Sequence, residues 1–240
     1  MSADFTFSRD QLDINLKELG RVFRKLNGKN AHAEIVLIGG ASVLINYDFR
    51  EMTADADALI YTNAAMRDAI NQVRNSNNLP GDWLNEDFKN TKSYTEKLRG
   101  VSVHYRTFSN ILHVRTVTAQ YLVAMKAMSG RQYKFDLSDI VGILWAHDKN
   151  GRPISRAAID NAIEELYGQE PAPEISLYLL DIIFSGNVDY ERLYNETRAR
   201  EKETKEVLFE FLSEYPGALK KDNINDVIAQ AMKLKAQSNE

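Results

Sequence analysis

The chain has 240 residues, a length that allows one or two domains with a substantial core. Its net charge of −4 and 27% charged residues are typical of a soluble globular protein, and exclude a polyanion binder that works by bulk charge. It contains no cysteine, which excludes disulfides, thiolate zinc sites and cysteine nucleophiles. The apolar runs are short and the N-terminus lacks a secretory signal, so we expect a cytoplasmic protein without a membrane span.

The first elements in chain order mix helices and strands. Ser8 and Gln11 form a capping box, and apolar residues at helical spacing follow up to a stop at Gly28. The run EIVLI, residues 34–38, predicts a strand that turns on two glycines into a short helix. The run DADALIY, residues 55–61, predicts the next strand, and a helix over about residues 63–75 follows.

The later elements become helical. A polar loop leads to two strand candidates, VSVHYRTF at residues 101–108 and NILHVRTV at residues 110–117, and then to two helices. Beyond about residue 155 the strand signals fade and amphipathic helices remain. The pattern predicts an α/β (α+β) core with a small mixed sheet over residues 1–150. An all-helical C-terminal region over residues 151–240 is expected to pack on that core.

Two carboxylates stand close together where the strand at residues 55–61 begins. Residues i and i+2 of a strand point to the same face, so Asp55 and Asp57 converge. Like charges side by side repel, and a hard cation between them would reverse that penalty. Magnesium suits the pair, because it takes one or two carboxylates and fills its other positions with water and phosphate oxygens.

The glycine turn before this strand fits the same chemistry. A strand that turns on Gly39 and Gly40 into a helix presents free N–H groups and a positive dipole end to a phosphate, and Ser42 can add a hydroxyl. Each feature alone has an ordinary alternative. The turn is a common strand–helix junction with Ser42 as a capping residue, and a lone D-x-D is often a solvated strand end. Their order and setting together favour a function.

The stretch GGASVLINYDFREMTADADALI resembles the nucleotidyltransferase superfamily, and in particular the bacterial branch that includes AbiEii-type abortive-infection toxins. The features shared with that branch are the glycine pair with a following serine, an arginine before T-x-D-x-D, and a later helix that carries a lysine. In this sequence they are Gly39, Gly40, Ser42, Arg50, Thr53, Asp55, Asp57 and Lys126.

The resemblance implies a nucleotidyltransferase-like core and a role for each matching residue. Asp55 and Asp57 would hold Mg²⁺ on a nucleoside triphosphate. The triphosphate contacts would come from Gly39, Gly40, Ser42, Arg50, Thr53 and Lys126. The reaction would move a nucleoside monophosphate to a hydroxyl of RNA or protein and release pyrophosphate. The branch also implies a toxin or phage-defence role, with an antitoxin as a possible partner.

Active members of the superfamily commonly have a third acid on a later strand of the sheet, where it binds the metal or acts as the general base. In this sequence the strand over residues 101–108 contains no acid. Asp139 is the candidate for that role, with Asp136 one turn before it expected to cap the helix. Lys126 could instead snorkel from an amphipathic helix, and Arg50 could be a structural ion-pair partner. The alternative function is therefore a catalytically degenerate module of the same fold that binds nucleotides or another protein.

Overall fold

The computed structural model describes residues 5–62, 64–218 and 224–238. The chain divides by its contacts into two compact units. The first comprises Met1–Met128 and Ile154–Pro171, and the second comprises Ser129–Pro153 and Ala172–Glu240. The domain boundaries predicted from the sequence, 1–150 and 151–240, and the packing of the tail on the core stay predictions. Each unit is described by itself below.

The first unit is built on a mixed five-stranded sheet with the strand order β3-β2-β1-β5-β4. β1 pairs in parallel with β5 and antiparallel with β2, while β2 pairs in parallel with β3, and β4 antiparallel with β5. The strands are β1 (Ala33–Leu37), β2 (Ala56–Thr62), β3 (Leu84–Asn85), β4 (Ser102–Phe108) and β5 (Leu112–Val117).

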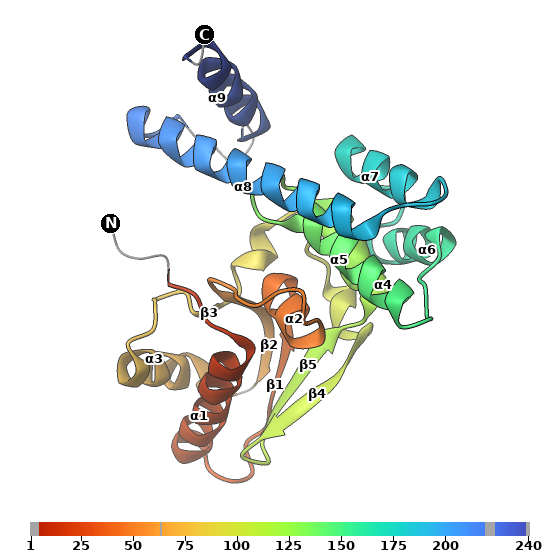
Figure 1. Ribbon diagram of the computed structural model, residues 1–240. Helices are drawn as coiled ribbons and strands as arrows, with labels where there is room; N and C mark the ends of the chain where they lie inside the picture. Colours follow the sequence, from red (N-terminus) through yellow and green to blue (C-terminus); the bar gives the residue numbers. More distant parts are fainter. Residues whose placement is uncertain (1–4, 63, 219–223, 239–240) are drawn as a thin grey trace. The chain divides into compact units, whose positions relative to one another are not determined.

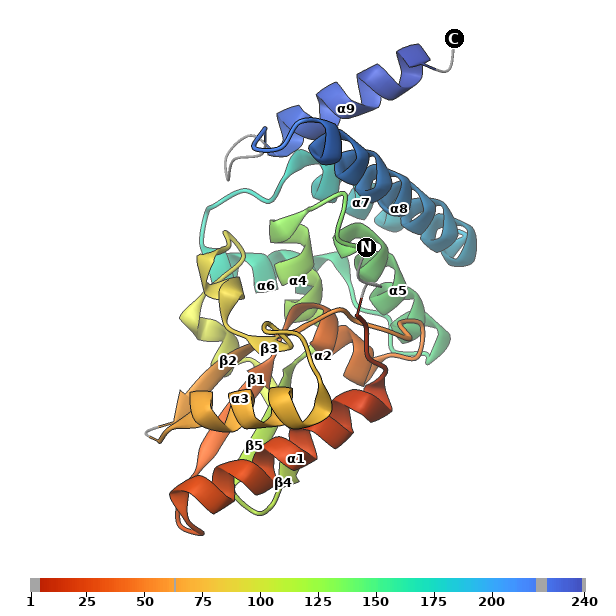
Figure 2. The ribbon, with the colours of Figure 1, turned by 90° about the vertical axis from the view of Figure 1, so that its left-hand side faces the viewer.

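Helices surround the sheet within this unit (Figures 1 and 2). They are α1 (Arg9–Asn27), α2 (Gly39–Asn46), α3 (Met66–Asn77), α4 (Ala119–Ser129) and α6 (Arg156–Tyr167), with 3₁₀ turns η1 (Asp87–Asn90) and η2 (Glu96–Arg99). The predicted capping box opens α1, with Gln11 N–H donating to Ser8 Oγ over 3.4 Å. Leu12, Leu16 and Phe23 are fully buried in one cluster with side chains of β1, so the apolar stripe of α1 forms the core of this unit.

The short strand β3 differs from the loop that the sequence predicted over this stretch. Trp83 is fully buried, and its carbonyl accepts a hydrogen bond from Ala56 N–H over 2.9 Å. Burial of this one indole brings the loop against the edge of β2, where Ala56 and Asp57 pair with Leu84 and Asn85. β3 therefore pairs with the part of β2 that carries Asp57.

The second unit is all-helical in its described residues. Its helices are α5 (Asp136–Lys149), α7 (Glu174–Phe184), α8 (Tyr190–Glu214) and α9 (Ile224–Ser238). α8 contacts both α5 and α9, and a small apolar cluster that includes Val207, Phe211 and Ile228 joins α8 to α9. The mixed sheet of the first part and the helices α5–α9 confirm the fold class predicted from the sequence.

The start of α5 is held by a carboxylate from another helix. Asp136 does not cap α5 as expected, because its carboxylate is bound by Arg131, whose Nε donates over 2.8 Å. Instead, Glu201 of α8 accepts the N–H groups of Leu137 and Ser138 over 2.8 and 3.2 Å. Burial raises the pKa of Glu201 to about 7, although these hydrogen bonds act in the opposite direction.

Candidate functional site

The turn between β1 and α2 favours glycine at both positions, for different reasons. Gly39 adopts φ of +54°, a left-handed conformation that glycine adopts readily, and a Cβ built there would lie 3.4 Å from Asp57 Oδ2. A Cβ on Gly40 would lie 2.8 Å from both Arg50 Nη2 and Thr53 Oγ1, closer than real contacts allow. The two glycines therefore bring the backbone of the turn against Asp57 on one side and against Arg50 and Thr53 on the other.

The N-terminal end of α2 presents unpaired backbone donors. Its capping residue, Ile38, makes no side-chain cap, and the first helical hydrogen bond runs from Ser42 N–H to the Ile38 carbonyl over 3.2 Å. Within the described part of the chain, the N–H groups of Gly39, Gly40 and Ala41 have no hydrogen-bond partner. Three such donors at the positive end of a helix form a suitable site for an anion.

The aspartate pair lies at the start of β2, beside this turn. Ile38 N–H donates to the Asp57 carbonyl over 3.0 Å, which fixes the end of β1 to the strand that carries the carboxylate. Asp55, directly before β2, and Asp57 are both half-buried, while Ala56 between them is fully buried. Among the described residues, the Asp55 carboxylate has no hydrogen-bond or ion-pair partner. The structure thus brings Gly39, Gly40 and Asp57 together, with Asp55 next to them.

The segment between α2 and β2 is fixed by contacts that the sequence did not reveal. Thr53 forms an isolated β-bridge with Phe7, with backbone hydrogen bonds of 2.9 and 3.1 Å. Thr53 Oγ1 also donates to the Asp55 carbonyl over 3.1 Å, and Arg50 Nε donates to the Met52 carbonyl over 3.4 Å. Sequence reasoning missed Phe7 as a positioning residue. Its only signal was the alternation of Phe5 and Phe7 with polar residues before α1.

Ser42 and Lys126 are both buried in the first unit. The Ser42 hydroxyl accepts a hydrogen bond from Asn46 Nδ2 over 3.4 Å, and Asn46 Oδ1 in turn accepts one from Thr116 of β5. Lys126 on α4 is only 4% exposed, so it does not snorkel to the surface. Contact of either residue with phosphate stays a prediction.

Asp139 belongs to the second unit, on the first turn of α5, and is fully buried. Its approach to Asp55 and Asp57 stays a prediction. Among the described residues, no group of three or more histidine, aspartate or glutamate side chains could hold a metal ion. No described helix has the length and apolar character that crossing a bilayer requires.

Comparison with known protein families gives a match. A family described as a nucleotidyltransferase of unknown function (DUF6036) matches residues 14–145, more than half of the chain. The matched segment contains the glycine turn, both aspartates, Lys126 and Asp139. No curated protein and no solved structure matches the chain. The match shows that the chain belongs to this family of nucleotidyltransferases.

Proposed function

We propose that the chain moves a nucleoside monophosphate from a nucleoside triphosphate to a hydroxyl group of RNA or of a protein. The family supports the reaction class. The observation that carries the proposal is the meeting of the glycine turn with the aspartate pair, where a Cβ on Gly39 would lie 3.4 Å from Asp57 Oδ2. A phosphate on the turn would then lie beside the carboxylates.

The turn would bind the phosphates through its backbone. The N–H groups of Gly39, Gly40 and Ala41 donate to phosphate oxygens, and the absence of side chains on both glycines lets the ligand approach the backbone closely. Arg50 and Thr53 pack against Gly40, so they position the turn in addition to contacting the triphosphate. Lys126 would neutralise triphosphate charge, and Ser42 would have to exchange its bond with Asn46 to reach a phosphate.

Asp55 and Asp57 fit a magnesium ion. Asp57 lies at the start of β2 and Asp55 two residues before it, so both offer oxygen ligands at the same end of the strand. Magnesium commonly uses one or two carboxylates together with phosphate oxygens and water. We propose that these two residues hold Mg²⁺. When bound, the ion would stabilise negative charge on the phosphoryl oxygens.

The reaction is an in-line displacement at the α-phosphorus. The acceptor oxygen forms a bond to that phosphorus, the bond to the oxygen that bridges to the β-phosphorus breaks, and pyrophosphate leaves with the electron pair. The acceptor hydroxyl must also lose its proton to a base. We propose Asp139 for that role, because the segment that carries it resembles the corresponding segment of the toxin branch.

A second candidate function is nucleotide binding without turnover. The observation that favours it is the lack of a third metal-binding acid beside the pair among the described residues, together with a strand β4 that carries His104 and Arg106 but no carboxylate. Such a module would bind a triphosphate with magnesium and release no pyrophosphate.

We also propose, from the resemblance to abortive-infection toxins, that the transfer inactivates a cellular RNA or protein and that an antitoxin restrains it. Induced expression in a bacterial host should then arrest growth, and Asp57→Asn should relieve the arrest. Growth arrest that persists in this variant would contradict a toxin activity based on nucleotidyl transfer.

The test of the transfer itself uses each of the four nucleoside triphosphates labelled at the α-phosphate, with magnesium and cell extract. We expect one of them to label a macromolecule, and Asp57→Asn to abolish the label. Asp68→Asn, at an exposed position of α3, is the matched control and should retain it. Binding of a triphosphate with neither label nor pyrophosphate would favour the binding-only function.

A further inference from the structure

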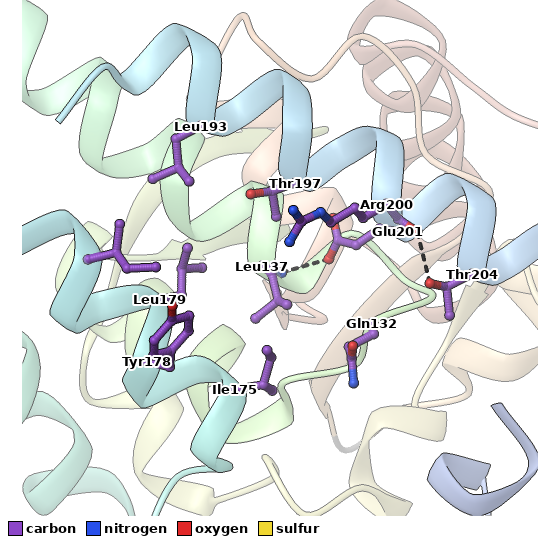
Figure 3. Close-up of a pocket in the computed structure, with 11 residues that line it drawn as sticks. Gln132, Leu137, Ile175, Tyr178, Leu179, Leu193, Thr197, Arg200, Glu201 and Thr204 are labelled. Carbon is purple, nitrogen blue, oxygen red and sulfur yellow. Dashed lines mark hydrogen bonds between the residues drawn. The ribbon is translucent and has the colours of Figure 1, made fainter. Parts of the chain in front are cut away.

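We propose that a pocket in the second unit binds a small organic anion whose apolar body is about the size of a benzene ring. The pocket lies between α7, α8 and the start of α5 (Figure 3). All of its lining residues belong to this unit, so the proposal does not rest on nucleotidyl transfer.

The walls of the pocket are mainly apolar. They are formed by Leu137, Ile175, Tyr178, Leu179, Ile182 and Leu193. The cavity volume is about 140 Å³, and an apolar cavity of roughly this size holds one benzene ring. Tyr178 is 63% exposed although it lines the pocket. An apolar group in the pocket would remove part of this surface from water, which favours binding.

One side of the pocket carries a cation. Arg200 lines it, and Figure 3 shows its guanidinium group between Thr197 and Glu201. Arg200 is exposed and has no ion-pair partner among the described residues. The hydroxyl of Thr197 adds a further polar group to the lining. Guanidinium groups bind carboxylates and phosphates with paired hydrogen bonds, so this side of the pocket favours an anion.

Glu201, which also lines the pocket, does not cancel the preference for an anion. Glu201 is only 1% exposed, and its two oxygens accept the N–H groups of Leu137 and Ser138. When Glu201 is ionised, its charge therefore faces the N-terminal end of α5, where the helix dipole is positive. Arg200 remains as the charge available to a ligand, which leads us to infer a carboxylate or phosphate attached to an apolar body.

The test uses 3-phenylpropionate as the probe and the full chain with ¹³C-labelled leucine and isoleucine methyl groups. We expect saturable shifts at Leu137, Leu179 and Ile182, with a dissociation constant on the order of 1–10 mM for a ligand of this size. The neutral analogue 3-phenylpropionamide should bind at least about five-fold more weakly, because it cannot pair with Arg200 as an anion.

Two variants complete the design. Arg200→Gln should weaken binding of the acid at least about five-fold and leave binding of the amide unchanged. Lys202→Gln removes an exposed cation of α8 that does not line the pocket, and should change neither. Three results would overturn the proposal: no saturable shift up to about 50 mM acid, equal affinity for acid and amide, or an unchanged affinity for the acid in Arg200→Gln.

Discussion

Substitution of Gly40 by alanine tests the packing of the glycine turn without any ligand. The added Cβ would lie 2.8 Å from both Arg50 Nη2 and Thr53 Oγ1. The end of the arginine can move, but the Thr53 side chain is short and its backbone is bridged to Phe7. Overpacking of this kind costs about 1–3 kcal/mol. We therefore expect Gly40→Ala to lower the free energy of unfolding by that amount.

The matched control is Gly81→Ala. A Cβ there would have its nearest contact with Arg74 Nη1 at 3.9 Å. The free energy of unfolding should therefore change by no more than about 0.5 kcal/mol. A double-mutant cycle with Thr53→Ala tests the cause, because removal of Oγ1 makes space for the new methyl group. The penalty of Gly40→Ala should then fall by at least about 0.5 kcal/mol.

The assay is urea unfolding followed by tryptophan fluorescence in a Trp145→Phe background. Only two tryptophans occur in the chain, and the remaining one, Trp83, is fully buried in the first unit. Its fluorescence therefore reports the unit that contains the turn. A midpoint for Gly40→Ala equal to that of Gly81→Ala would refute the close packing of Arg50 and Thr53 on the turn.

Three further predictions concern single side chains. Glu201 retains a proton in the folded state between its ordinary pKa of 4.5 and about 7, so its contribution to the free energy of unfolding should fall by roughly 3 kcal/mol as pH rises through that window. In a pH series of urea titrations Glu201→Gln should flatten this dependence, and an equally steep fall in the variant would contradict it. Arg131→Gln should lower the free energy of unfolding by about 3–5 kcal/mol, because it removes an ion-pair partner of the fully buried Asp136, and a shift in Tm below that of an exposed Lys202→Gln control would argue against the pair. Asp55→Asn should leave the free energy of unfolding within about 0.5 kcal/mol of wild type, since the Asp55 carboxylate has no partner among the described residues, and a large loss would reveal a structural role.

The local parts of the fold were predictable from the sequence. Short-range sequence patterns predict the capping box of α1, the strand–turn–helix at Gly39 and the strand after Asp55. The structure contains each of them. The approach of Asp57 to the glycine turn was not predicted: β2 pairs antiparallel with β1, which brings the start of β2 to the end of β1.

Contacts between distant segments could not be predicted from one sequence. The bridge from Phe7 to Thr53 and the capping of α5 by Glu201 join residues far apart in the chain, and no local pattern at one residue identifies its partner. β3 was missed for a different reason. The loop around Trp83 has the polar composition of a solvent-exposed segment, and the burial of a single indole is enough to pair two of its residues with β2. Local composition gives no measure of such tertiary packing.

The most direct test of the central claim is calorimetric titration of the purified chain with each nucleoside triphosphate, with and without magnesium. The measurement needs no knowledge of the acceptor. The account predicts that at least one triphosphate binds only with magnesium, that Asp57→Asn weakens this binding at least about ten-fold, and that Asp68→Asn does not. Binding that persists equally in Asp57→Asn, or that does not depend on magnesium, would contradict a triphosphate site formed by the glycine turn and the aspartate pair.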